Sequence, residues 1–273
     1  MLFPVLVGFA LVLCVCRIAT ASELLIEQVV ASETGFDGAV TVVETSEQNS
    51  VEMVTVDIPY RDVNGDTKMG QARLFVRRED LATGKPIPPF CHVHYERDPA
   101  TAAGTCERGW AVSTAHYQEA GGKYPIDVAV GNGYNLARAI VQWVRRLPFI
   151  DRTHLHIDGG SQGGYMALAM TAEFFPVAAT TADCPVVNWA YNFNYFEANK
   201  KAAEWPRLGM DDSPLPIVNA VELITNWAYG VFGNDLTSDT WYRLSPIACL
   251  DCITNPVLAV CATGDMLVPM EQM

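Results

Sequence analysis

The stretch Gly159-Gly160-Ser161-Gln162-Gly163-Gly164 is the most informative part of this chain because of the segments on either side of it. A strand-like run, residues 153–158, precedes it, and a helix-like run, residues 165–170, follows it. A strand that turns abruptly into a helix holds its central residue in a strained conformation, and glycines two positions before and after that residue leave room for the backbone. The pattern predicts a nucleophile elbow that exposes the Ser161 hydroxyl. A glycine-rich turn with no chemical role is the alternative.

The predicted helix begins directly after Ser161 and adds a second chemical feature. The first amides of a helix have no partner within the helix, and the helix dipole places partial positive charge at this end. The backbone N–H of Gln162 is therefore the expected donor to an oxyanion that forms beside Ser161.

Length and composition favour one large domain. The chain has 273 residues, half of them apolar, which is enough to form a large buried core, and a second full domain is not expected. Strand-like and helix-like segments alternate from residue 51 onward. This order predicts an α/β fold over residues 51–273, with a mostly parallel sheet and helices on both faces.

The start of the predicted domain resembles an antiparallel hairpin. Residues 51–58 and 73–76 have strand patterns, and Asn64-Gly65 between them is a turn signal. The spacing Asp62-x-Asn64-x-Asp66 is also found in calcium loops, but Thr67 stands where such a loop needs glycine, so the turn is favoured.

An aromatic-rich insertion is expected at residues 186–242, between two predicted core strands. Over the carboxyl edge of a sheet, such rings could line a pocket for an acyl group or side chain. The alternative, favoured for most of them, is that the rings form the insertion's own core.

The N-terminus has the features of a signal peptide at residues 1–21, followed by an extension at 22–50. An apolar run too short to span a bilayer comfortably precedes Ala19-Thr20-Ala21, a small-x-small cleavage site. Because no Lys or Arg precedes the run, a retained membrane anchor is the alternative. Cleavage would remove Arg17 and take the formal net charge from −13 to −14, which disfavours nucleic acid and anionic membranes. We expect a secreted or periplasmic protein without stable membrane insertion.

Six cysteines remain after residue 21, an even number that permits disulfides. Cys91 and Cys261 lie in apolar strand-like runs and are expected to be buried thiols. Cys249 and Cys252 have the spacing of half a zinc site, but no second pair of ligands accompanies them. A local disulfide or two free thiols is favoured there, and neither metal nor cofactor is expected.

Several motifs together resemble the α/β-hydrolase fold, and within it the catalytic domain of the prolyl oligopeptidase family and the related acetyl esterases. They are residues 109–112, the elbow at 160–164, Ser245-Pro246, residues 256–258 and residues 264–269. The resemblance implies that Asp265 is the acid that orients a catalytic histidine; a turn aspartate is the alternative. It also implies a second oxyanion donor near Tyr95, although an aromatic residue that only packs is equally compatible.

The histidine that the resemblance requires does not follow Asp265. His156 is five residues before Ser161 on one strand, about 16 Å away, whereas a general base must be within about 3 Å. His94 is the remaining substitute, at the strand beside the elbow, and His116 has no predicted position. We therefore expect that the family's last strand, histidine loop and final helix lie beyond Met273, which leaves residues 256–261 at an apolar sheet edge.

The sequence thus predicts a serine hydrolase that cleaves an ester or a peptide or amide bond of a small-molecule or peptide substrate, through an acyl-enzyme on Ser161. The alternative is a catalytically inactive hydrolase fold that binds a ligand or protein.

Overall fold

The computed structural model describes residues 39–116, 131–173, 177–199, 215–265 and 267–273. The predicted signal peptide, most of the predicted extension and Trp205 lie outside these ranges. Within them, no helix combines the length and the apolar character needed to cross a lipid bilayer.

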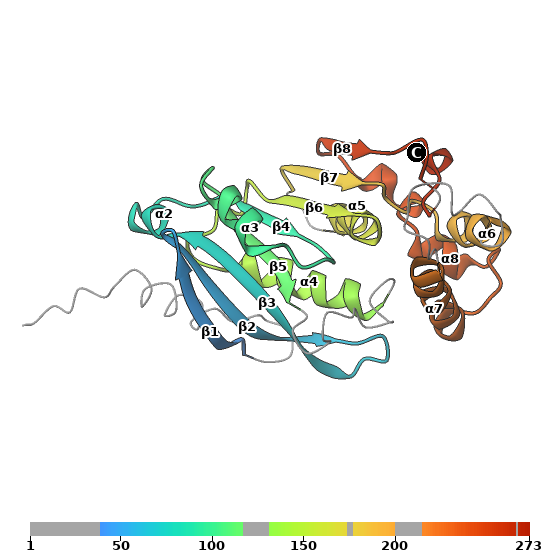
Figure 1. Ribbon diagram of the computed structural model, residues 1–273, viewed down its shortest axis with the longest axis horizontal. Coiled ribbons are helices and arrows are strands. Elements are labelled where there is room, and N and C mark those ends of the chain that lie inside the picture. Colours follow the sequence, from blue (N-terminus) through green and yellow to red (C-terminus); the bar gives the residue numbers. More distant parts are fainter. Residues whose placement is uncertain (1–38, 117–130, 174–176, 200–214, 266) are drawn as a thin grey trace, which may run out of the picture.

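A mixed eight-stranded sheet organises the chain, in the order β1-β2-β3-β5-β4-β6-β7-β8 (Figure 1). The pairs β1/β2, β2/β3 and β3/β5 are antiparallel, and from β5 to β8 all pairs are parallel. The predicted mostly parallel α/β sheet with an antiparallel N-terminal hairpin is confirmed. The strands are β1 Thr41–Gln48, β2 Val51–Arg61, β3 Thr67–Arg77, β4 Pro89–His92, β5 Ala111–His116, β6 His156–Gly160, β7 Ala179–Asp183 and β8 Val257–Val260.

The hairpin of β2 and β3 turns as its sequence predicts. Asp62 Oδ1 accepts hydrogen bonds from the N–H groups of Asn64 and Asp66, both at 2.9 Å, and Gly65 has a φ of 86°. The Asp62 carboxylate therefore satisfies the turn's own amides. Strand β1 lies within residues 22–50, the predicted extension, and adds one strand to the sheet beside β2.

Helices cover both faces of the sheet, as the alternation of side chains along the strands requires. Helix α3 (Pro99–Cys106) packs on one face, against Phe75 and Val112. Helices α4 (Asn132–Val144) and α5 (Gln162–Glu173) pack on the other face. A short helix, α2 (Arg78–Ala82), follows β3. Because the strand neighbours Ala111 and Val112 fall in different clusters, the sheet separates two hydrophobic cores.

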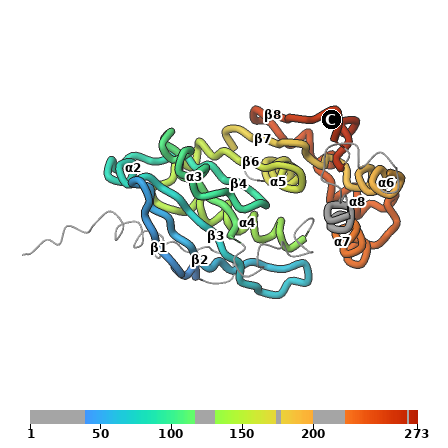
Figure 2. Tube along the Cα trace, in the orientation of Figure 1, coloured from blue at the N-terminus to red at the C-terminus, as the bar shows by residue number. Residues whose placement is uncertain are grey.

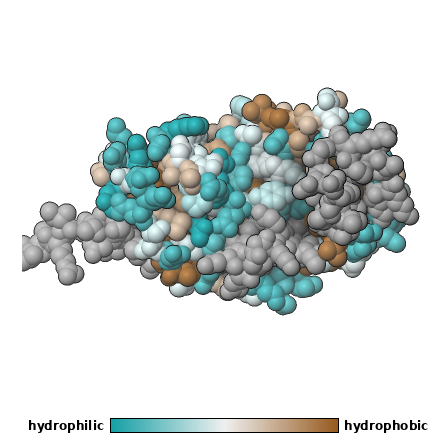
Figure 3. All heavy atoms as spheres, viewed as in Figure 1, coloured by the Kyte–Doolittle hydropathy of each residue, from teal (hydrophilic) through white to brown (hydrophobic). Residues whose placement is uncertain are grey.

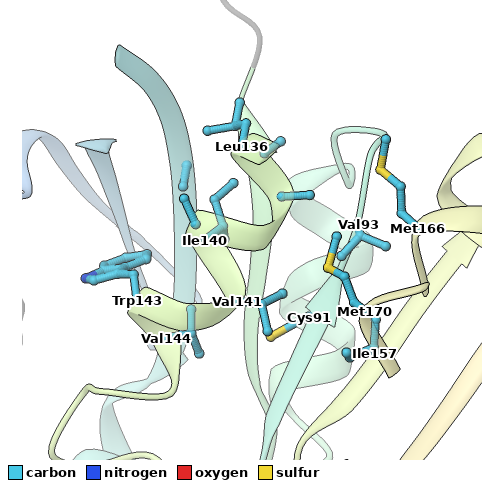
Figure 4. Close-up of a cluster of buried hydrophobic side chains, with 14 of the residues drawn as sticks. Cys91, Val93, Leu136, Ile140, Val141, Trp143, Val144, Ile157, Met166 and Met170 are labelled. Carbon is cyan, nitrogen blue, oxygen red and sulfur yellow. The ribbon is translucent and has the colours of Figure 1, made fainter. Parts of the chain in front are cut away.

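The larger core lies between the sheet and helices α4 and α5 (Figure 4). Figure 4 shows Val141 of α4 beside Cys91 of β4, with Ile157 of β6 and Met170 of α5 close by. All four side chains are buried. Cys91 is a buried thiol, as predicted, and burial raises its pKa to about 12.

The described residues of the predicted aromatic-rich insertion form the helices α6 (Trp189–Asn199) and α7 (Leu215–Phe232) and the start of α8 (Asp239–Leu244). Phe193 lies 5.4 Å from Trp189, 5.6 Å from Tyr229 and 5.2 Å from Trp241, measured between ring centroids. Trp189, Phe193 and Trp241 are buried. These rings therefore form the insertion's own core, whereas Tyr191 and Tyr242 are exposed.

Strand β8 lies at the edge of the described sheet and pairs with β7 (Figure 2). All four of its residues are exposed, and Leu258 reaches 61%. Hydrophobic surface accordingly gathers over β8 (Figure 3). An apolar edge strand of this kind is a template for pairing with another chain. Short 3₁₀ segments, Pro246–Ala248, Leu250–Cys252 and Met270–Gln272, flank this part of the chain.

We expect Leu258→Lys to reduce self-association of the 273-residue polypeptide, because a charge on an edge strand opposes association between edges. Leu250→Lys is the matched control, since Leu250 is exposed but lies outside the strand. Sedimentation velocity on both variants measures the effect. Equal association of the two variants would contradict the assignment of β8 as the association-prone edge.

Candidate active site

Ser161 occupies the sharp turn between β6 and α5. Its φ is +54°, in the left-handed region that residues other than glycine rarely adopt. Two backbone hydrogen bonds fix this turn: the Ser161 N–H donates to the Asp183 carbonyl at 2.7 Å, and the Ser161 carbonyl accepts from the Tyr165 N–H at 3.1 Å. The geometry matches the strained strand-to-helix turn that the sequence predicts.

The glycines around Ser161 are required by close backbone approaches. A Cβ on Gly159 would overlap the Gly163 carbonyl, and a Cβ on Gly163 would come within 2.6 Å of the Val93 carbonyl oxygen. Gly164 is similarly restricted, with the Asp183 carbonyl oxygen at 2.9 Å from the position of a Cβ. Gly160 differs, because its nearest neighbours would be 3.8 Å away. Three of the four predicted elbow glycines are therefore sterically required.

The parallel strands bring the predicted site segments to one edge of the sheet. Tyr95 follows β4, Ser161 follows β6 and Asp265 follows β8, and the carboxyl ends of parallel strands lie at the same edge. Strand β4 is the neighbour of β6 on one side, as predicted, and β7 separates β6 from β8 on the other. The in-register pairs across these four strands are His92–Asp158, Asp158–Thr181 and Thr181–Leu258.

The Gln162 amide opens α5 directly behind Ser161. The first hydrogen bond that closes this helical turn is donated by Tyr165, three residues later. The Gln162 N–H thus belongs to the set of first-turn amides that an α-helix cannot satisfy internally. Its position suits a donor to negative charge beside Ser161.

Side-chain contacts fix the loop that carries Tyr95. Thr114 Oγ1 donates to the Tyr95 carbonyl at 3.2 Å and accepts from the Arg97 N–H at 2.9 Å. Glu96 Oε1 accepts from Arg73 at 2.6 Å and lies 2.7 Å from His116 Nδ1. His116, whose position the sequence did not predict, is thereby placed at the end of β5, buried against this loop.

Arg97 links the same loop to the elbow strand. Its guanidinium lies 3.2 Å from Asp158 Oδ2, and the same oxygen is 2.6 Å from His92 Nδ1. Arg97 also lies over the Phe90 ring, 4.9 Å from its centroid. Sequence reasoning did not identify Asp158 or Arg97, because only the pairing of β4 with β6 brings them together.

Asp265 caps the turn that follows β8. Its Oδ1 accepts hydrogen bonds from the N–H groups of Leu267 and Val268, both at 2.9 Å, and its own N–H donates to the Ala262 carbonyl at 3.2 Å. These bonds fix the orientation of the carboxylate at the edge that also carries Ser161. They are equally the bonds of a turn aspartate, so the geometry is compatible with both predicted roles.

All five histidines lie within the described residues, and no hydrogen bond joins any of them to the Ser161 hydroxyl there. His156 begins β6, at the end opposite Ser161, and stacks on Phe90 with ring centroids 4.8 Å apart. His154 pairs with Asp151 at 2.7 Å. The remaining three contact the loop or the elbow strand: His92, His94 and His116.

His94 is the histidine nearest the elbow, and its environment keeps it neutral. It is buried, its φ is +79°, and its Cβ lies 3.2 Å from where a Cβ of Gly163 would be. Burial, with a smaller contribution from His92, lowers the pKa of His94 to about 3. A general base near neutral pH needs a much higher pKa, so His94 does not suit that role.

Two thiol predictions receive different outcomes at this edge. Cys261 was expected to be buried but is only half-buried, because β8 is an exposed edge strand. Cys249 and Cys252 are free thiols, which is one of the two predicted states. Across the described residues, no group of three or more His, Cys, Asp or Glu side chains is arranged to hold a metal ion.

The sheet order and the strained turn at its carboxyl edge define an α/β-hydrolase fold. The acylaminoacyl peptidase of Pyrococcus horikoshii is similar, with a TM-score of 0.54 and 11% identity over 86% of this chain and 42% of that chain. A puromycin-hydrolysing peptidase of Mycobacterium tuberculosis has a TM-score of 0.51 and 15% identity over 84% of this chain and 40% of that chain. This chain therefore spans less than half of the length of these peptidases.

Residues 104–214, from α3 through the elbow and β7, match the sequence model of the prolyl oligopeptidase family. The predicted α/β-hydrolase fold is confirmed, and the predicted resemblance to the prolyl oligopeptidase family is supported over these residues. An acetyl xylan esterase of a Thermoanaerobacterium species is also similar, with a TM-score of 0.49 and 15% identity over 88% of this chain and 86% of that chain. No curated protein matches the chain.

We expect Gly159→Ala to destabilise the protein and Gly160→Ala to be nearly neutral. The first methyl group would overlap the Gly163 carbonyl, at a cost of about 1–3 kcal/mol or more. The second enters ordinary contact distance, so its effect should stay within about 0.5 kcal/mol. Urea denaturation of the two variants measures the difference. Equal stabilities would contradict the close crossing at Gly159.

Acid should destabilise the protein partly through His94. Its native pKa is about 3, below the value near 6.5 expected when unfolded, so the unfolded state binds more protons as pH falls from 6.5 towards 3. Between pH 7 and 4.5 the wild type should lose on the order of 2 kcal/mol more stability than His94→Asn, since asparagine does not titrate and tolerates positive φ. Denaturation at both pH values tests this. Parallel losses would show that His94 is not the buried neutral group.

Proposed function

We propose that this protein is a serine hydrolase that cleaves an ester or an amide bond through an acyl-enzyme on Ser161. The observation that carries the proposal is the φ of +54° at Ser161, in a strand-to-helix turn enclosed by Gly159 and Gly163. A strained conformation is retained where the surrounding structure enforces it, and such positions cluster at functional sites. At the carboxyl edge of a parallel sheet, this turn presents a hydroxyl to substrate.

In the proposed reaction, Ser161 Oγ attacks the substrate carbonyl carbon and loses its proton to a base. The Gln162 N–H donates to the oxyanion that develops, and a group of the loop at Tyr95 supplies the second donor. The ion pairs of Arg97 and Glu96 and the hydrogen bond from Thr114 support this assignment, because they fix the loop, and an oxyanion donor must be in place before the charge develops. Water then cleaves the acyl-enzyme.

The proposed base is a histidine oriented by Asp265. None of the five histidines of this chain is proposed as the base. His156 is at the far end of β6 from Ser161, and His94 is buried and neutral. The proposal therefore assigns the base to a histidine outside residues 1–273. Sequencing of the transcript across codon 273 tests this point, and a stop codon there would instead favour the inactive binding fold.

The substrate class is proposed as a small ester or an acylated amino acid or peptide. The similar structures are named as peptidases, including one named for the hydrolysis of puromycin, and this choice of substrates for a first assay follows those names. Both ester and amide cleavage pass through the same tetrahedral intermediate, so the elbow serves either. We further propose export through residues 1–21, on the strength of their sequence pattern alone.

Covalent labelling tests the nucleophile directly. A fluorophosphonate probe should label a protein that extends past residue 273 and carries the proposed histidine, and Ser161→Ala in that protein should abolish the label, because the hydroxyl oxygen is the attacking atom. Ser238→Ala is the control: Ser238 precedes α8 without a capping side-chain hydrogen bond, so its loss should leave labelling unchanged. Peptide mapping identifies the modified residue. A label that persists in Ser161→Ala would exclude Ser161 as the nucleophile.

A further inference from the structure

Two of the described cysteines are placed as neighbours by the sheet. Cys91 and Cys106 are buried in cores on opposite faces, so they cannot pair with each other. Cys249 and Cys252 are close in sequence: Cys249 immediately precedes the 3₁₀ segment that ends at Cys252. The two that remain, Cys184 and Cys261, follow the last residues of the adjacent strands β7 and β8.

The hydrogen-bond ladder places Cys184 directly opposite Cys261. In the described register Thr180 lies opposite Val257, and its N–H donates to the preceding residue on β8, Pro256. The Cys184 N–H donates in the same way to the Val260 carbonyl, at 2.6 Å. The same rule makes Cys261 the partner of Cys184.

The spacing of such a pair suits a disulfide. Neighbouring strands lie about 4.7–4.9 Å apart, and disulfides join Cα atoms that are about 4.4–6.8 Å apart. Cys184 lies just after β7 and has a φ of 43°, so the backbone register places the two residues side by side without the side-chain alternation of a strand. The Ala262 N–H, next to Cys261 in the chain, and the Asp265 carboxylate are near enough to the Cys184 thiol to shift its pKa, the first downwards and the second upwards.

We propose that Cys184 and Cys261 form a disulfide that joins the carboxyl ends of β7 and β8. The oxidant is a disulfide of low molecular weight or of an exchange protein. One cysteine thiolate attacks this disulfide and expels a thiol; the second thiolate then attacks the mixed disulfide and expels another. The two cysteines lose two electrons and two protons, and the oxidant becomes two thiols.

The thiols themselves should react slowly. Burial raises the pKa of Cys184 to about 11 and also raises that of Cys261, where Asp183 and Asp265 add to the effect. Because the thiolate is the reactive species, little of it forms at neutral pH. This suits a bridge made once during folding in an oxidising compartment.

The bridge would act on the proposed active site, and this part of the inference rests on the proposed function. The Asp183 carbonyl accepts the Ser161 N–H, and Cys184 is the next residue. Cys261 begins the segment that ends at Asp265. A disulfide would therefore fix the turn at Ser161 and the segment from Cys261 to Asp265 relative to each other. It would also remove the Cys184 thiol from the Asp265 carboxylate, leaving the Leu267 and Val268 amides as donors.

Disulfide mapping on the full chain tests the pairing. The reduced, unfolded protein is refolded in the presence of oxidised glutathione, free thiols are alkylated, and peptides are analysed without reduction. We expect one cross-linked species containing Cys184 and Cys261, lighter than the two thiol peptides by two hydrogen masses. It should persist in Cys252→Ser, the matched control, and vanish in Cys261→Ser. Alkylation of both Cys184 and Cys261 after oxidation would overturn the proposal, as would a cross-link to another cysteine.

Two further measurements complete the test. The first uses the wild type and so does not depend on a variant that folds, and the second distinguishes failure of the disulfide proposal from failure of the proposed function. The wild-type melting temperature should rise by roughly 5–10 °C on oxidation, because the bridge closes a long loop. An unchanged melting temperature would count against the pairing. The bridge should also form in Ser161→Ala, since thiol exchange does not use the serine. A protein that carries the proposed histidine beyond residue 273 and is bridged but not labelled by fluorophosphonate would retain the disulfide and exclude the hydrolase.

Discussion

The crossing of β6 and α5 at Gly159 and Gly163 is the constraint on which the site depends. A Cβ on Gly159 would overlap the Gly163 carbonyl, and a Cβ on Gly163 would overlap the Val93 carbonyl, so the chain can reverse from strand to helix in one residue only because both positions lack one. Ser161 bears the strain of this reversal, and the Asp183 and Tyr165 hydrogen bonds hold it there. The neighbouring strand is involved too, since the Val93 carbonyl faces Gly163.

The loop after β4 is fixed by charge and hydrogen bonding, whereas the elbow is fixed by steric fit. Arg97 pairs with Asp158, the middle residue of β6, and Glu96 joins Arg73 to His116. The loop is thus tied to β3, β5 and β6 at once. His94, between the loop and the elbow, stays neutral because burial disfavours its charged form. His94 therefore packs beside Gly163 and does not act as a proton acceptor near neutral pH.

Within the described part of the insertion, the buried aromatic residues serve packing and do not line a pocket. Trp189, Phe193 and Trp241 interlock as a small core and contact the elbow helix through Tyr165, whose ring lies 5.1 Å from Trp189. The insertion is therefore anchored to α5 by packing. A row of aromatic residues between core strands predicts burial more strongly than it predicts a pocket, because large rings bury much apolar surface and so stabilise a core.

The sequence alone determined the strand-to-helix turn at Ser161, the hairpin at Asn64-Gly65 and the α/β order, because each depends on local backbone preferences or on short-range periodicity. It also excluded His156 as the general base for Ser161, since the distance between two residues of one strand follows from the number of residues between them. Only the tertiary structure decided which strands are neighbours. That pairing brings Asp158 to His92 and Arg97, places His116 against Glu96, and sets Cys184 opposite Cys261. These contacts join residues far apart in the chain, and no local pattern encodes the partner of a strand.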